Sequence, residues 1–306
     1  MRIDKYLVAF LLIIATSLNS NAQRLEIAFA LPTGADQLSN NTGKIIRSKF
    51  LPIMTDNGIE TTDVSTIAIR PEVSFSNRQV VEGGMKNIHT ADVQFNFICT
   101  NLMTGTVYAS LVMNINGSGL SDDETVKNAA NQLSSQDKRL SDFIIKSKDK
   151  ILEYYSENLN AIISRAQTSA NLHQYGEALA LLFSCPSTIP SYSRINNQIV
   201  SIYRQYQTEE CSNIVQKARA EYANGKYVEA AEWLKQVDMT SSCASEAKQL
   251  CETIKKSKDA DAARIINLIE NVSKRQADLE KQRISAARDV AVAYFKQKRS
   301  DIYFMW

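Results

Sequence analysis

The sequence predicts an α+β protein, in which a mostly antiparallel sheet with two helices precedes an all-α region. Between residues 24 and 135, apolar and polar residues alternate in several segments, which is the spacing of strands. From residue 138 to residue 300, apolar residues recur every three or four positions, which is the spacing of helices. Only 10 glycines and 5 prolines occur in 306 residues, and this scarcity favours long helices.

Residues 1–22 are expected to form a signal peptide. Arg2 and Lys5 precede a ten-residue apolar run, and small residues stand just before Gln23, where we expect cleavage. The run is half the length of ~20 residues that a membrane-spanning helix needs, and no later segment reaches that length. We therefore expect an exported protein, periplasmic or extracellular, that is soluble or peripherally associated with the envelope.

An α+β domain is expected over residues 23–137. Its strands are predicted at 24–31, 66–76, 91–100 and 106–115, and its helices at 35–55 and after Ser121. In the third strand, Val93, Phe95 and Phe97 alternate with polar residues and define the buried face. Ser121 is a good N-cap, and three acidic residues follow it where the helix dipole favours negative charge.

The end of this domain carries a resemblance. A strand ending in Gly117-Ser118-Gly119, then Ser121, then the small residues Ala129 and Ala130, resembles the small α/β domains of periplasmic assembly proteins. These are the curli-secretion family, the penicillin-binding-protein activators and the flagellar T-ring protein. The resemblance covers about a third of the chain and implies an accessory role in an envelope assembly.

Residues 138–252 are expected to form a helical domain with an internal repeat, and residues 138–171 are predicted as a long helix joining the two domains. At an offset of 52 positions, one set of residues matches another: Ile162, Ala166, Tyr175, Ala178 and Leu182 against Ile214, Ala218, Tyr227, Ala230 and Leu234. This spacing resembles the tetratricopeptide repeat, a pair of antiparallel helices, and implies a protein-binding helical surface. The offset exceeds the regular repeat of about 34 residues, so residues 191–207 predict an extra or a lengthened helix.

Residues 253–306 are expected to form a long charged helix over 259–300 and an apolar tail. The helix begins with a heptad-like stripe, typical of a coiled coil, which Arg275 and Gln282 interrupt. An exported chain must bury such a tail against its own body or against a partner. The candidate interaction residues are therefore Tyr303, Phe304 and Trp306 of the tail, and Tyr192, Tyr203, Tyr206 and Tyr222 along 191–223. For the four tyrosines, a place in a core seam is the alternative.

Cys211 and Cys243 form a candidate disulfide. If the second helical hairpin is antiparallel, the chain returns to the level of Cys211 just before Cys243. Such a bond would contribute about 3–4 kcal/mol in the chain-entropy model. Two buried thiols are the alternative. The chain has no CxxC motif and only two isolated histidines, so we expect no metal and no cofactor.

The remaining motifs argue against an enzyme. Gly43-Lys44 lacks the glycine spacing of a phosphate loop, and no serine stands in a GxSxG turn. A net charge of +2 gives no reason to expect nucleic-acid binding. We expect no catalytic residue and predict a scaffold or accessory protein that mediates protein–protein contacts in a cell-envelope or secreted assembly. The alternative is a ligand- or glycan-binding envelope protein that uses the α+β domain.

Overall fold

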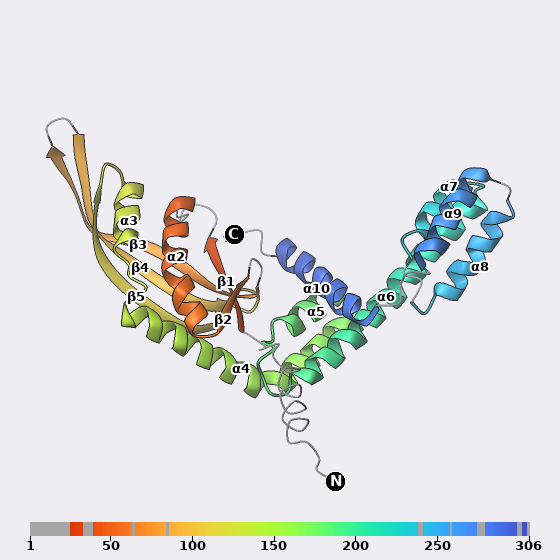
Figure 1. The fold of residues 1–306 in the computed structure, drawn as a ribbon, viewed down its shortest axis with the longest axis horizontal. Coiled ribbons are helices and arrows are strands. Elements are labelled where there is room, and N and C mark those ends of the chain that lie inside the picture. The colour runs from red at the N-terminus through yellow and green to blue at the C-terminus, as the bar shows by residue number, and fades with distance from the viewer. Residues whose placement is uncertain are drawn as a thin grey trace, which may run out of the picture.

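The computed structural model describes residues 25–32, 39–62, 65–83, 86–237, 241–257, 259–273, 279–298 and 302–304, so the expected signal peptide lies outside the described residues. The chain has the predicted class: a mixed sheet of five strands with helices, then a largely helical region (Figure 1). The elements of the first part are β1 (Leu25–Pro32), α2 (Asn40–Asp56), β2 (Ile59–Thr62), β3 (Ile67–Gly83), β4 (Lys86–Asn101), β5 (Val107–Gly119) and α3 (Asp122–Asn131).

The sheet has the strand order β2-β1-β3-β4-β5. Its long pairings, β3 with β4 and β4 with β5, are antiparallel as expected, but β1 runs parallel to both β2 and β3. The parallel pair arises because α2 carries the chain back between β1 and β2, as parallel strands require. β2 was not predicted, because its four residues are too few to show an alternating pattern.

The β3–β4 hairpin is longer than predicted. The expected strands stop at Ser76 and begin again at Ala91, whereas the pairing continues to Gly83 opposite Lys86. The register shifts between Ser76 and Gln79, and beyond this point the strands leave the body of the molecule (Figure 1). Because both faces of this extension meet solvent, its sequence carries no alternation that would mark it as a strand.

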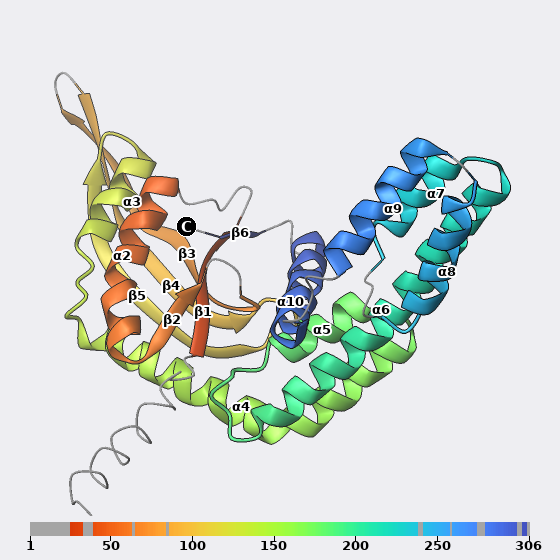
Figure 2. The ribbon, with the colours of Figure 1, turned by 45° about the vertical axis from the view of Figure 1, so that its right-hand side comes forward.

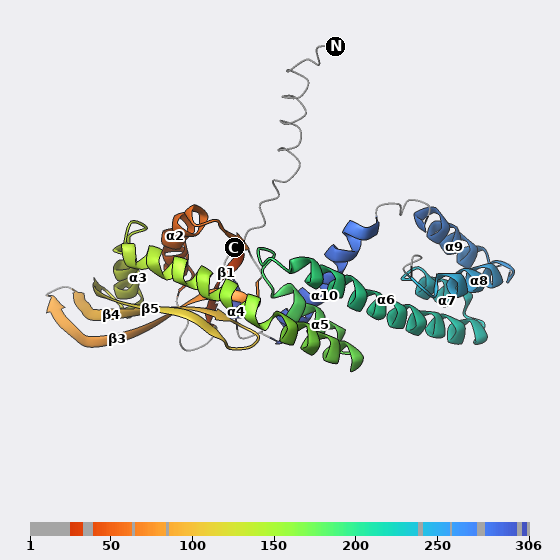
Figure 3. The same cartoon turned by 90° about the horizontal axis from the view of Figure 1, so that it is seen from below.

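The helices α2, α3 and α4 cover one face of the sheet (Figure 3). Phe50 of α2 stands at the centre of this core, with its ring 4.8 Å from that of Phe97. Gly117 and Gly119 allow α3 to approach β5, because a Cβ atom at Gly117 would lie 2.4 Å from the carbonyl oxygen of Thr125. Ser121 caps α3 as predicted, and its hydroxyl accepts a hydrogen bond from the amide of Glu124 at 3.2 Å.

The second part consists of α4 (Lys138–Asn171), α5 (Tyr175–Phe183), α6 (Tyr192–Ala223), α7 (Tyr227–Leu234), α8 (Ala244–Lys255), α9 (Ala260–Ser273), α10 (Leu279–Lys298) and the short strand β6 (Ile302–Phe304). The predicted helix over 138–171 is α4, and the excess residues of the repeat lie in α6, a single helix of 32 residues. No helix in the described part of the chain is both long enough and apolar enough to cross a bilayer.

The single helix expected over 259–300 is replaced by two. α9 packs against α7 and α8, whereas α10 packs against α5 and α6. The two helices have different neighbours, so they are not one rod (Figure 2). The heptad-like stripe crosses residues 274–278, which lie outside the described residues.

Two large hydrophobic cores and one small cluster result. The first joins the sheet to α4, α5, the N-terminal half of α6 and α10, and includes Phe95, Tyr155, Ile199 and Ala291. The second lies among the C-terminal half of α6, α7, α8 and α9. The division between the cores therefore falls within α6, between Tyr203 and Cys211, and the first core crosses the expected boundary at residues 137 and 138.

Candidate functional site

The two hairpins of the predicted repeat turn in the same way. His173 follows α4 with a φ of +60°, and Gly225 follows α6 with a φ of +75°. In both turns the next amide reaches back five residues: Gln174 N–H donates to Ser169 at 2.9 Å, and Lys226 N–H to Glu221 at 3.0 Å. This is the Schellman pattern, in which the left-handed position favours glycine. The offset of 52 thus relates two turns of equal geometry.

Three side chains fix the first turn to α6. Glu209 pairs with the Nδ1 atom of His173 at 2.5 Å and accepts a hydrogen bond from the hydroxyl of Tyr175 at 2.8 Å. These two hydrogen bonds lower the pKa of the Glu209 carboxyl, the one from His173 most. Burial, and then the bond to Glu209, raise the pKa of Tyr175 to about 12. One of the two histidines therefore stabilises a turn.

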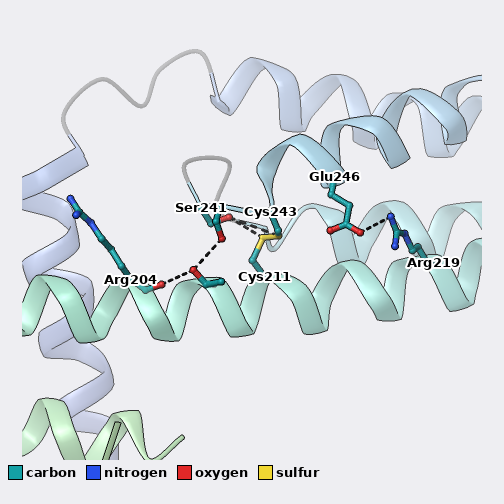
Figure 4. The surroundings of a disulfide bond; sticks show 8 residues. Arg204, Cys211, Arg219, Ser241, Cys243 and Glu246 are labelled. Atoms are coloured by element: carbon teal, nitrogen blue, oxygen red, sulfur yellow. Dashed lines mark hydrogen bonds and ion pairs between the residues drawn. A yellow bond between two sulfur atoms is a disulfide. The ribbon is translucent and has the colours of Figure 1, made fainter. Parts of the chain in front are cut away.

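Cys211 of α6 and Cys243 are joined by a disulfide, with their Cα atoms 6.1 Å apart (Figure 4). Two polar contacts flank it: Arg219 pairs with Glu246 at 2.6 Å, and the Ser242 hydroxyl donates to that of Thr208 at 3.1 Å. Together they hold the start of α8 against α6. Disulfides persist in oxidising compartments, and this one agrees with export.

The four candidate tyrosines of α6 are all partly buried. Tyr192 and Tyr203 pack against the first core, and the ring of Tyr206 lies 5.8 Å from that of Tyr175. Tyr222 packs against the second core, with its ring 5.5 Å from that of Tyr227. Tyr206 and Tyr222 thus lie between neighbouring helices, and all four tyrosines keep an exposed part.

The C-terminal tail returns to the sheet of its own chain. β6 pairs antiparallel with the end of β1, with Tyr303 opposite Leu31 and Phe304 opposite Ala30 (Figure 2). Trp306 lies outside the described residues. The backbone of the tail is therefore engaged within the chain.

A pocket of about 390 Å³ lies where the sheet meets the helices, and we call it the junction pocket. The starts of β1, β3 and α6, the end of α5 with the loop after it, and one face of α10 line this pocket. Six of its lining side chains are apolar or a thiol and at most 3% exposed: Leu25, Ile67, Ala180, Cys185, Ala291 and Phe295. These six side chains, which we call the floor of the pocket, are therefore uncharged and mostly apolar.

The rim of the junction pocket is polar. Arg288 of α10 pairs with Glu26 of β1 at 2.7 Å, and these side chains are 48% and 42% exposed. Tyr192 stands beside the pair: burial raises its pKa, the charge of Glu26 adds to the rise, and that of Arg288 opposes it. Hydroxyl groups add to the polar lining: Ser65, Thr66, Ser184, Ser187 and Ser285.

The described residues contain no group of three His, Cys, Asp or Glu side chains that could hold a metal ion. Burial raises the pKa of the Cys185 thiol to about 12, so it stays protonated and is a poor nucleophile. The second histidine, His89, pairs with Asp122 at 3.1 Å. Comparisons with protein-family models, with curated proteins and with solved structures found no match for this chain.

The docking of α10 on α5 was not predicted from the sequence, although Gly176 signals it. A Cβ atom at Gly176 would lie 2.9 Å from the Cβ of Tyr294, so only glycine allows α10 so close. The Tyr294 hydroxyl then donates to Glu177 at 3.2 Å. The equivalent residue of the second hairpin is Val228. Gly176 therefore marks the close approach of α10, whereas α9 packs against α7 of the second hairpin without a glycine there.

Proposed function

We propose that this chain is an exported, non-enzymatic scaffold or accessory protein that binds another protein of a cell-envelope or secreted assembly. The observation that carries the proposal is the second core. Residues 208–273, which we call the distal module, pack around a core of their own and stand apart from the sheet (Figure 1). α6, about 48 Å long at 1.5 Å per residue, carries the module outward.

The arrangement of the distal module supports a binding role. α6 with α7, and α8 with α9, are successive helical hairpins, in keeping with the resemblance to tetratricopeptide repeats. Such arrays bind peptides or helices along their helix faces. The disulfide between Cys211 and Cys243 holds the hairpins in place before a partner arrives, which reduces the ordering cost of binding.

We assign the contact to an aromatic patch on α6 and α7, made of Lys217, Tyr222, Tyr227, Val228 and Trp233. The ammonium of Lys217 lies 4.7 Å from the centre of the Trp233 ring. Both tyrosines, Val228 and Trp233 are partly buried against the second core and keep an exposed part. Tryptophan and tyrosine dominate the energetics of protein interfaces, because a large rigid ring is buried at low entropic cost.

The test is crosslinking in intact cells followed by mass spectrometry, with the full chain and with an excised variant. The variant joins Gln207 to Leu279 through a flexible Gly/Ser linker. It removes the second core and keeps α10 and the first core. We expect one envelope protein attached to the full chain and absent from the excised one.

A point variant sharpens the test. Trp233→Ala should weaken the crosslink, whereas Ile145→Ala, an exposed apolar side chain on α4, should leave it unchanged. Attachment of the same partner to the excised chain would refute the assignment to the distal module.

A further inference from the structure

We propose that the junction pocket is a binding site for an uncharged amphiphile, a molecule with an apolar body and one neutral polar head. This inference goes beyond the scaffold function and does not depend on it. It places a ligand site at the meeting point of the sheet and the helices rather than on the distal module.

The body of the ligand follows from the floor. Six side chains that are at most 3% exposed form a surface without charge. Apolar groups gain about 25 cal/mol for each Å² removed from water, and this floor offers them that gain. The volume of about 390 Å³ is at the lower end of ligand pockets. It fits one acyl chain or one fused ring system.

The neutral head follows from the rim. Glu26 and Arg288 lie 2.7 Å apart and cancel one another's charge, and the other polar lining groups are hydroxyls. The Glu26 carboxylate repels an anion that the neighbouring guanidinium attracts. In the same way, the guanidinium repels a cation that the carboxylate attracts. A hydroxyl or amide head has no such penalty, because the hydroxyls of the rim both donate and accept hydrogen bonds.

Binding here is non-covalent. Cys185 is the thiol of the pocket, and burial keeps it protonated. The pocket draws on residues from both ends of the described chain, since Leu25 and Phe295 both line it. A bound molecule would therefore bridge β1 and α10.

Two dyes with the same anilinonaphthalene body provide the test: neutral N-phenyl-1-naphthylamine and the sulfonate 8-anilinonaphthalene-1-sulfonate. Fluorescence titration of the full exported chain should give saturable one-to-one binding of the neutral dye and at least about tenfold weaker binding of the sulfonate. Val292→Trp, which fills the pocket from α10, should abolish binding of the neutral dye. Ala293→Trp is the matched control, because Ala293 is exposed on the same helix and lies outside the pocket lining.

Glu26→Gln tests the rim without touching the floor. Removing this carboxylate leaves Arg288 uncompensated, so the sulfonate should gain on the order of tenfold in affinity while the neutral dye is unchanged. If Val292→Trp does not fold, this variant decides alone. Three outcomes would overturn the proposal: no saturable binding of the neutral dye, binding that a folded Val292→Trp retains, or sulfonate binding that Glu26→Gln leaves unaltered.

Discussion

Reduction of the Cys211–Cys243 disulfide should destabilise the distal module and leave the first core intact. The two cysteines are 32 positions apart, and the chain-entropy model gives about 3.7 kcal/mol for closing a loop of that length. The bond lies within the second core, and the first core contains neither cysteine. For a unit of roughly 60 to 100 residues, a change of 1 kcal/mol in unfolding free energy shifts the midpoint temperature of thermal unfolding by roughly 4–8 °C. Reduction should therefore lower the midpoint temperature of the distal module by about 15 °C or more.

Native-state hydrogen exchange, with and without reductant, measures this directly. The free energy of opening of amides in α7 and α8 should fall by about 3.7 kcal/mol, while that of amides in β4 should not change. The double variant Cys211→Ala/Cys243→Ala should behave like the reduced protein and should not respond to reductant. Equal loss of protection in β4 and α8 would show that the two cores unfold together, and the reasoning from separate cores would fail.

Three further outcomes are expected. Phe50→Ala should cost about 3–5 kcal/mol in the free energy of unfolding of the first core, measured by urea denaturation, because its buried ring contacts Phe97 and Phe143; a loss below 1 kcal/mol would mean that the site collapses around the cavity. Gly176→Val should release α10 from α5 and raise its proteolysis, because even the first carbon of the new side chain would meet Tyr294 at 2.9 Å; unchanged cleavage would contradict that contact. The carboxyl of Glu209 has a lowered pKa in the folded state. It therefore stabilises the fold at pH values above its unfolded pKa of about 4.5, and this stabilisation is lost as the pH falls through the folded pKa. The unfolding free energies of the natural chain and Glu209→Gln should converge in acid, and a constant difference down to low pH would refute this.

The elements that the sequence predicts well are those whose local pattern and tertiary burial agree. α4 buries Leu140, Ile151, Tyr155 and Ala166 at helical spacing, so its two ends were predicted to the residue. The cap at Ser121 was equally plain. The parallel pairing of β1 was missed, because four-residue β2 has no pattern of its own and the direction of β1 depends on the crossover through α2. Sequence periodicity reports burial and not the direction of neighbouring strands.

The candidate sites divide in the same way. The repeat offset predicted the two hairpins, and an antiparallel second hairpin predicted that Cys211 and Cys243 lie close together. Both predictions follow from the geometry of neighbouring helices. The junction pocket carried no signal of that kind. Its ion pair joins Glu26 to Arg288, residues 262 positions apart, and its floor draws one or two residues each from β1, β3, α5, the loop after α5 and α10. A short sequence motif cannot predict a site whose residues lie so far apart in the sequence.

The position of α10 connects the two proposals physically. The chain leaves the first core along α6, forms the distal module, and returns to the first core with α10. The module is therefore an insertion anchored at both ends, and a partner bound to it is held at a defined place relative to the sheet. Because α10 also lines the junction pocket and is followed by β6 on β1, a bound ligand would strengthen one of the two anchors. If a bound ligand changes the affinity of the chain for its partner, the partner must change the affinity for the ligand by the same factor, because one coupling free energy links the two binding events.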